Sequence, residues 1–507
     1  MKKQVPEEYK ALAAISTKIH TYHSILSLLH WDQETYMPPG GITARSQQIA
    51  EISSLIHEEK TSQKFKRCLS KLVHLTSGKP RIKGLNKEQL AACREWLNQF
   101  DKSKRLPTSF VKNFSQITAE ASQVWAIAKK TNNFKLFAPF LEKIVQLNRK
   151  KAEILGYEDH PYDSLLQGYE PCMTTKRVAA LFDGLEKELK GLLKKISSAD
   201  SIKDTFLHKK IDERKQLSIS QKLLSHLPIE KAYSRLDLSS HPFSMALHPH
   251  DSRITTRFLP HAFMSNIFSI LHEAGHSLYE MGLPLEHWGT PLAEYISLSI
   301  HESQSRFWET LIGKSLPFWK SFYPQLQEEL SFLKKVPLQG FYPAINKVIP
   351  SFVRVEADEV TYSFHVILRF RLEKKLIEGT LQVVDLPEAW NAEMKNLLQI
   401  TPPTDTLGCL QDIHWSLGDF GYFPTYALGN LFAAQFFGSF QKQHPDWETR
   451  VASGDLSFVR EWLKANIHKW GRRYNADELV KKITGKPLSE AAYCTYLKKK
   501  YNKIYKL

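Results

Sequence analysis

Apolar residues that recur three and four positions apart through the first two hundred residues constrain the fold more than any other feature of this sequence. This spacing places them on one face of an α-helix. In the segment "EEYKALAAISTKIHTYHSILSLLHW" the residues on that face are Leu12, Ile15, Ile19, Tyr22 and Ile25. The breaks "MPPGG" at 37–41 and "TSGKP" at 76–80 are short and typical of turns. The pattern predicts a fold that is mainly α, built from amphipathic helices.

The length of the chain allows a large buried core. With 507 residues, 42% of them hydrophobic, it is long enough for one very large domain or for two to three average ones. No internal repeat is visible, which argues against a solenoid. We expect a single domain, 1–507, with an N-terminal helical lobe at about 1–200 and a second lobe at about 201–507.

The cysteines and the apolar segments bear on the cellular compartment. The five cysteines are odd in number and scattered, and none forms a C-x-x-C pair, so neither a disulfide framework nor a thiolate zinc site is indicated. The start of the chain has no apolar h-region, and stretches such as "NLFAAQFFGSF" are too short to span a bilayer. We expect a cytoplasmic protein without a membrane partner.

The net charge is strongly positive. Lys and Arg exceed Asp and Glu by 16, which suits nucleic acid, an acidic membrane surface or an anionic substrate. The basic residues are spread along the chain, and no signature of an RRM, KH or zinc-finger module is present. We therefore interpret them as solvated basic faces and expect no nucleic-acid partner.

One stretch has strand character, "FSMALHPHDSRITTRFLP" at 243–260. Within it, Arg253, Thr255 and Arg257 alternate with Ile254, Thr256 and Phe258, which is the period of a strand. A short sheet edge is predicted here. Such an edge can align an extended peptide by strand addition.

A candidate metal site follows directly. The segment "SNIFSILHEAGHSLYEMG", 265–282, is predicted to be a helix that begins at a serine cap and ends at a glycine. On it His272 and His276 lie one turn apart, close enough to share one ion. Glu273 lies beside the first histidine, where it could take a proton from a metal-bound water. A catalytic zinc site needs a third protein ligand and one open position.

Glu302 is the candidate for that third ligand. It lies in a second predicted helix, 289–313, which opens with a threonine–proline pair and closes at a glycine. The chain between the two helices is long enough for the second to return antiparallel across the first. The alternative is that Glu302 forms a surface ion pair with Arg306, four residues later.

Six motifs, taken in their order, resemble those of the carboxypeptidase Taq family of metallocarboxypeptidases. They are "HPF" at 241–243, "DSRITTR" at 251–257, "HEAGH" at 272–276, "HESQ" at 301–304, "VRVEAD" at 353–358 and "GCLQDIHW" at 408–415. Three further segments are similar to this family: "HWDQETYMPPGG" at 30–41, "SLLQGYEP" at 164–171 and "GYFPTYALGN" at 421–430. Val353 and Cys172 depart from the usual pattern, and neither touches the chemistry.

The resemblance implies a large, mainly α, zincin-like helical peptidase with a long central groove and a small β-sheet near the active site. It implies one divalent metal ion per subunit, usually Zn²⁺ or Co²⁺, and a homodimer. The expected activity is the removal of single residues from peptides with a free C-terminus, with broad specificity. By position, His272, His276 and Glu302 are similar to the family's metal ligands, and Glu273 is similar to its general base.

An exopeptidase must recognise the terminal carboxylate, and a planar, permanently charged guanidinium does so with paired hydrogen bonds. Arg354 is the first candidate and Arg253 the second. The alternative for either is a structural salt bridge, for instance with Glu356 or Asp251.

The developing oxyanion needs a donor besides the metal. His414 and Tyr422 are the candidates, and Tyr426 is too close in sequence to Tyr422 to be set aside. The alternative for each tyrosine is a core aromatic with a satisfied hydroxyl. His241 is expected to contact the substrate main chain, with a polar turn as the alternative, and His301 to support the site.

Two other functions remain open at this point. An oligopeptidase that cuts internally would use the same metal site but would ignore the terminal carboxylate. A basic helical binding protein with a degenerate metal site would bind nucleic acid in a salt-dependent way and have no peptidase activity.

Overall fold

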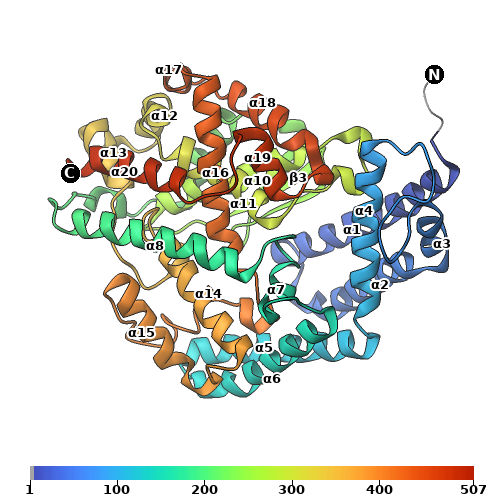
Figure 1. Ribbon diagram of the computed structural model, residues 1–507. Helices are drawn as coiled ribbons and strands as arrows, with labels where there is room; N and C mark the ends of the chain where they lie inside the picture. The colour runs from blue at the N-terminus through green and yellow to red at the C-terminus, as the bar shows by residue number, and fades with distance from the viewer. Residues whose placement is uncertain (1–4) are drawn as a thin grey trace.

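Helices make up most of residues 5–507, the part of the chain that is described by this structure, a computed structural model (Figure 1). The first ten are α1 (Glu7–Thr35), α2 (Ile42–Thr61), α3 (Gln63–Leu72), α4 (Lys87–Arg105), α5 (Thr108–Thr131), α6 (Phe134–Leu155), α7 (Pro161–Leu166), α8 (Thr175–Ser197), α9 (Glu213–His226) and α10 (Phe263–Gly282). They continue with α11 (Leu298–Arg306), α12 (Leu316–Glu329), α13 (Leu338–Ile345), α14 (Tyr362–Glu378), α15 (Leu386–Leu398), α16 (Pro424–Gln443), α17 (Trp447–Ala452), α18 (Ser457–Asn466), α19 (Ala476–Thr484) and α20 (Ala491–Tyr505). The predicted mainly α fold is confirmed.

The apolar face of α1 shows how the sequence pattern works and where it fails. Leu12, Ile15 and Ile19 are buried as predicted, but Ile25 is 39% exposed. Alternating steps of three and four residues lead from Ile19 to Tyr22 and then to Leu26, which packs against the core. Ile25 is rotated by about 100° from that stripe, so its inclusion was wrong.

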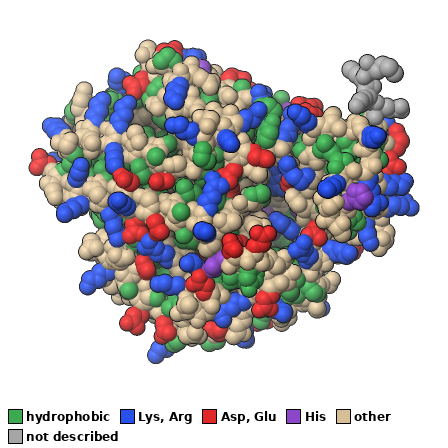
Figure 2. Space-filling view, in the orientation of Figure 1, with side chains coloured by type: hydrophobic (Ala, Val, Ile, Leu, Met, Phe, Trp, Pro, Cys, Tyr) green, Lys and Arg blue, Asp and Glu red, His purple; other side chains and the backbone are tan. Residues whose placement is uncertain are grey.

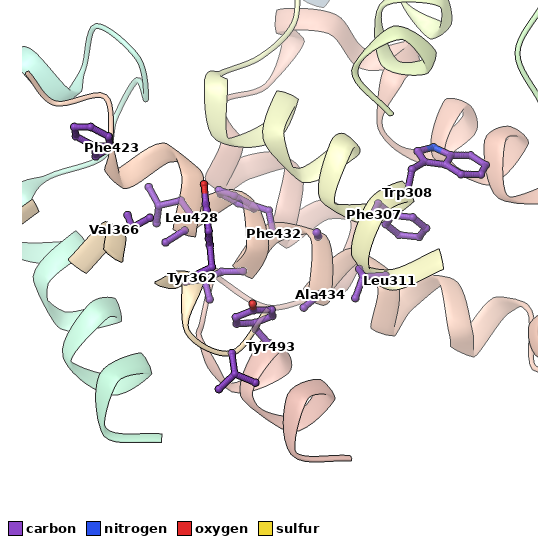
Figure 3. Close-up of a cluster of buried hydrophobic side chains, with 14 of the residues drawn as sticks. Phe307, Trp308, Leu311, Tyr362, Val366, Phe423, Leu428, Phe432, Ala434 and Tyr493 are labelled. Carbon is purple, nitrogen blue, oxygen red and sulfur yellow. The ribbon is translucent and has the colours of Figure 1, made fainter. Parts of the chain in front are cut away.

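Two hydrophobic clusters form the core. The smaller one is built from α1 to α4 and their connections, with Leu292 as its single member from later in the chain. The larger one holds side chains from residue 121 onward. Figure 3 shows part of it, where Phe307, Tyr362, Phe432 and Tyr493 come together from four different segments. The division into lobes near residue 200 stays a prediction.

A small sheet is formed by β1 (Ser234–Leu238), β2 (Ser244–His248) and β3 (Asp251–Thr256) in the order β1-β3-β2. β3 runs parallel to β1 and antiparallel to β2. The predicted segment therefore contains two strands, because Pro249 interrupts it. β1 was missed, although its "SRLDL" alternates polar and apolar residues.

The helices α1 to α4 lie on one side of the molecule, and α10, α11 and α16 lie near its centre (Figure 1). The space-filling view shows the surface hollowed between the α1–α4 side and the rest of the molecule (Figure 2). α10 packs on β2 and β3 and crosses α11, which in turn packs on α16. This arrangement brings the "HEAGH" and "HESQ" segments together. Within the described part of the chain, no helix combines the length and apolar character that a membrane span requires.

Candidate functional site

The first motif-bearing helix forms almost as predicted. α10 begins at Phe263, two residues before the expected serine cap, and ends at Gly282 as expected. Ala262 is its N-terminal neighbour, and no side chain caps the helix. The rings of His272 and His276 lie one turn apart, with their centroids separated by 4.8 Å.

The second predicted helix, 289–313, is divided into three pieces. A 3₁₀ turn at Pro291–Ala293 is followed by extended backbone, and α11 begins only at Leu298. The predicted start at the threonine–proline pair was therefore wrong. The cap is Ser297, whose hydroxyl accepts a hydrogen bond from Ile300 N. After α11 the chain continues as a π-helical segment, η6 (Phe307–Gly313), which ends at the predicted glycine.

The crossing of α10 and α11 brings the three expected ligands together. Nε2 of His272 lies 3.5 Å from Oε2 of Glu302, and Nε2 of His276 lies 3.6 Å from the same oxygen. One ligand atom from each residue lies within 4.8 Å of the others. In a tetrahedral zinc site with bonds of about 2.0–2.1 Å, ligand atoms are about 3.4 Å apart. The residues present therefore fit a divalent ion and leave a fourth position open.

The other ring nitrogen of each histidine, Nδ1, also has a hydrogen-bond partner. Nδ1 of His272 lies 2.8 Å from Oε2 of Glu309, a residue of η6. Nδ1 of His276 lies 2.6 Å from Nδ1 of His301, whose Nε2 lies 2.9 Å from Oε1 of Glu280. Such outer contacts fix the tautomer and the orientation of metal-binding histidines. They direct both Nε2 atoms toward Glu302.

Glu302 pairs with Arg306 as the alternative supposed, but this ion pair is buried and does not lie on a surface face. Oε1 of Glu302 accepts a hydrogen bond of 2.7 Å from Nε of Arg306, while Oε2 faces the histidines. Burial alone would raise the pKa of Glu302, but Arg306 and His272 hold it well below its usual range. The carboxylate is therefore ionised and available as a ligand.

Two glycines let α11 approach its neighbours. A Cβ on Gly275 would lie 2.6 Å from the carbonyl oxygen of Gln304, and one on Gly429 of α16 would lie 2.5 Å from Cγ of Glu302. A larger residue at either position would push the helix that carries Glu302 away. These residues were missed as functional ones, because a glycine inside a helical pattern does not reveal what it packs against.

Glu273 is on the buried side of α10, with 8% of its surface exposed. Burial raises its pKa, while His272 and a hydrogen bond from Ser244 oppose the shift. Ser244 belongs to the edge strand β2. The predicted base is thus next to the first ligand histidine and beside the sheet edge.

Arg354 is buried, with 5% of its surface exposed, in a cluster of charged groups. Its Nε and Nη2 donate to Oδ1 of Asp412 at 3.1 and 2.9 Å, and its Nη1 donates to the Tyr362 hydroxyl at 3.2 Å. Arg369 donates to the other carboxylate oxygen at 2.7 and 2.5 Å. The ion-pair partner is therefore Asp412 and not Glu356. Two buried guanidiniums share one carboxylate, which leaves an excess of positive charge.

Arg253 pairs with Asp251, as the alternative for it supposed, through hydrogen bonds of 3.0 and 3.1 Å. Its guanidinium also lies 4.3 Å from the ring centroid of Trp31. Arg235, its register partner on β1, lies 4.9 Å from the same ring. Arg253 thus connects α1 to the sheet. His241 is exposed in the turn before β2.

His414, Tyr422 and Tyr426 form one cluster. Nε2 of His414 lies 3.2 Å from the Tyr426 hydroxyl, and the Tyr422 ring lies 5.1 Å from the His414 ring and 5.3 Å from the Tyr426 ring. Burial, together with Arg354 and Arg369, lowers the pKa of His414 to about 4. The ring is therefore neutral near pH 7 and can donate one N–H. The cluster does not distinguish Tyr422 from Tyr426.

Comparison with known proteins shows which family the chain belongs to. The sequence model of the family described as carboxypeptidase Taq (M32) metallopeptidase matches residues 11–501. The chain belongs to this family. It is therefore a metallocarboxypeptidase, and membership implies a divalent metal ion.

The relatives match over nearly their whole length. Thermostable carboxypeptidase 1 of Thermus thermophilus is 39% identical over 492 residues, which cover 95% of this chain and 96% of the relative. Thermostable carboxypeptidase 1 of Pyrococcus furiosus is 39% identical over 501 residues, 98% of each chain. The crystal structure of the M32 carboxypeptidase from Deinococcus radiodurans superposes with a TM-score of 0.95 at 32% identity, over 99% of this chain and all of that one.

Some of the residues around the site were visible in the sequence but were not recognised. Glu280 lies four residues after His276, so His272, His276 and Glu280 share one helix face. Glu309 follows Glu302 by seven residues, again on one face of a regular helix. Asp412 stands in the "GCLQDIHW" motif, but nothing in the sequence indicates that two arginines converge on it.

Proposed function

We propose that this metallocarboxypeptidase removes single amino acids from the C-terminus of peptides with broad specificity. One observation carries the proposal: His272, His276 and Glu302 turn one ligand atom each toward a common centre, with Glu273 beside it. The donor set suits zinc and also accepts cobalt, because two imidazoles and one carboxylate bind several divalent ions. A bound ion would lower the pKa of a water molecule and polarise the substrate carbonyl.

Glu273 acts as the general base in this proposal. It takes a proton from the attacking water and returns it to the leaving amine. His414 and Tyr422, with Tyr426 as the alternative to Tyr422, donate hydrogen bonds to the developing oxyanion. The neutral state of the His414 ring supports this role, since a neutral donor retains its proton during the reaction.

Arg354 binds the terminal carboxylate of the substrate in this proposal. The support is electrostatic: a substrate carboxylate would balance the second positive charge of the Arg354–Arg369–Asp412 cluster. Arg253 and His241 are proposed to contact the substrate near the sheet edge, where the peptide main chain can align with β2. A homodimer is proposed from the family resemblance, and a cytoplasmic location from the five scattered cysteines, which are all free.

The test is mass spectrometry of one peptide with a free and with an amidated C-terminus, incubated with the zinc- or cobalt-loaded protein. We expect a ladder of single-residue losses from the free peptide and an intact amidated peptide. Internal fragments from both peptides would instead indicate an oligopeptidase and would remove the argument for a carboxylate clamp. Intact peptides in both reactions, with metal bound, would refute peptidase activity and leave a binding function.

A further inference from the structure

The segment "SLLQGYEP", 164–171, contains no residue with an assigned role, yet it contacts the start of α11. The carbonyl oxygen of Tyr169 accepts a hydrogen bond of 3.1 Å from Leu298 N. Oε2 of Glu170 accepts one of 3.2 Å from Ser299 N and one of 2.5 Å from the Ser299 hydroxyl. The Ser297 hydroxyl accepts a hydrogen bond from Ile300 N. The first three backbone amides of α11, those of Leu298, Ser299 and Ile300, therefore all donate hydrogen bonds.

The position of these contacts matters for the metal site. Ser299 precedes Glu302 by three residues, which is about one turn of helix. Glu170 is fully buried, and its carboxyl group lies at the positive end of the α11 dipole. Burial raises the pKa of Glu170 to about 7, while the hydrogen bonds from Ser299 oppose the shift. Among residues 5–507, Oε1 of Glu170 has no hydrogen-bond partner, so within this part of the chain the hydrogen bonds of the carboxyl group all come from the start of α11. A change at Glu170 would therefore act first on the helix that carries Glu302.

The same segment also contacts the loop that carries the proposed oxyanion donor. The Tyr169 hydroxyl donates to Oδ1 of Asp419 at 3.1 Å, and its ring packs edge-on against Tyr422, with centroids 5.2 Å apart. Gly421, at φ +90°, lies so close that a Cβ there would meet the Leu165 backbone at 2.7 Å. Adjacent residues, Tyr169 and Glu170, thus contact two parts of the active site that are far apart in the sequence.

The segment itself is well fixed. Oδ1 of Asp163 on α7 accepts hydrogen bonds of 2.6 Å from Thr175 N and 2.5 Å from the Thr175 hydroxyl, which closes the turn between α7 and α8. Tyr162 on the same helix donates to Glu373 of α14. A segment that is fixed in this way keeps the elements that it contacts at a constant distance from each other.

We propose that Tyr169 and Glu170 are positioning residues that fix α11, and with it Glu302, relative to the loop that carries Tyr422. Neither residue touches the reacting atoms. The proposal rests on the proposed function, because it takes Glu302 as a metal ligand and Tyr422 as an oxyanion donor. It assigns a role to a motif that the metal site and the substrate-binding residues leave unexplained.

The first experiment measures metal affinity in competition with a chelator, at a temperature where circular dichroism shows every variant folded. Glu170→Gln replaces the carboxyl group at the start of α11 by an amide that cannot ionise, and Glu170→Ala also leaves the Ser299 amide without its acceptor. Loss of a residue that directly orients a metal ligand weakens metal binding by about 10–100-fold. Glu170 acts on Glu302 only through α11, so we expect the lower end of this range, roughly tenfold, for Glu170→Gln and a larger loss for Glu170→Ala. The absorption spectrum of the Co²⁺ form should change as well.

Asp237→Asn is the matched control. Asp237 on β1 is also a buried carboxyl that accepts several hydrogen bonds, but these come from Arg235 and Tyr36 and not from α10, α11 or the segment 164–171. We expect its metal affinity to equal that of the parent. Unchanged metal affinity and an unchanged Co²⁺ spectrum in both Glu170 variants, with only a lower melting temperature, would reduce Glu170 to a stabilising residue and overturn its positioning role.

Tyr169→Phe tests the other contact. It removes the hydrogen bond to Asp419 but keeps the ring against Tyr422. We expect kcat to fall several-fold, while KM and metal affinity stay at the parent values. An unchanged kcat would overturn the role of the Tyr169 hydroxyl. A further variant, Glu302→Ala, distinguishes failure of this proposal from failure of the proposed function. If Glu302 is not a metal ligand, this variant will keep the metal affinity of the parent.

Discussion

Glu373 on α14 is a buried carboxyl whose ionisation should oppose folding. It is fully buried, and Oε2 accepts hydrogen bonds of 2.6 Å from the Tyr162 hydroxyl and 3.1 Å from Gly421 N, while Oε1 accepts one of 2.8 Å from Trp415 Nε1. Burial outweighs these bonds and raises its pKa from 4.5 to about 7. No Lys or Arg forms an ion pair with Glu373 among the described residues.

The pKa shift determines how stability depends on pH. The folded protein holds this proton up to about pH 7, whereas the unfolded chain releases it near 4.5. The stabilisation is therefore fully present below pH 4.5 and is lost as the pH rises through 7. A shift of about 2.5 units corresponds to roughly 3 kcal/mol. At an unfolding entropy of about 2.1 cal/mol/K per residue, this is a change of about 3 °C in the melting temperature of a chain of 507 residues.

The perturbation is Glu373→Gln, and the assay is thermal unfolding of parent and variant at pH values from 4.5 to 8. The parent should lose about 3 °C more than the variant over this range, because the glutamine cannot ionise. The exposed Glu388→Gln on α15 is the control and should run parallel to the parent. Parallel curves for Glu373→Gln and the parent would refute the reasoning, since burial would then not have raised the pKa of Glu373.

Three further predictions concern the active site. Glu273→Gln should keep the metal content and lower turnover by at least about 10²-fold, the usual contribution of a general base; ordinary turnover would remove Glu273 from the mechanism. Arg354→Lys should raise KM for free peptides by roughly 10–100-fold, the equivalent of one charge-assisted hydrogen bond, whereas an unchanged KM would point to Arg253. Gly275→Ala should cost about 1–3 kcal/mol of stability through overpacking and weaken metal binding, because its Cβ would displace α11 at Gln304; parent-like stability and metal affinity would contradict the close approach.

Features set by neighbours in the sequence were predicted well. The approach of His272 to His276 follows from the period of one helix. The buried face of α1 follows from the same period, provided that the steps of three and four residues alternate. The boundaries of the second helix were predicted less well. Pro291 suits the first turn of a helix, but that turn is 3₁₀ and stops at Ala293, while the cap that starts α11 is Ser297. Thr290, Ser297 and Ser299 offer alternative caps within ten residues, and packing selects among them.

Features set by distant segments could not be predicted from the spacing of residues. The convergence of Arg354 and Arg369 on Asp412 depends on how α14 packs beside the loop before α16. The π-helical turn that carries Glu309 to His272 is equally invisible, because the sequence of η6 is compatible with a regular helix. The resemblance to a family supplied the identity of the motifs but not the contacts between them.

The arrangement of the site follows from where charge is buried. Glu302 lies beside a permanent cation, Arg306, and close to His272 and His276, so it remains ionised at a position where an isolated carboxylate would be protonated. Arg354 and Arg369 share one carboxylate, that of Asp412, so this second cluster carries an excess of positive charge. In the proposed function a metal ion would complete the first cluster and a substrate carboxylate would complete the second. Each cluster would then bind the charge that it lacks, which is what a metal-dependent carboxypeptidase requires of its two sites.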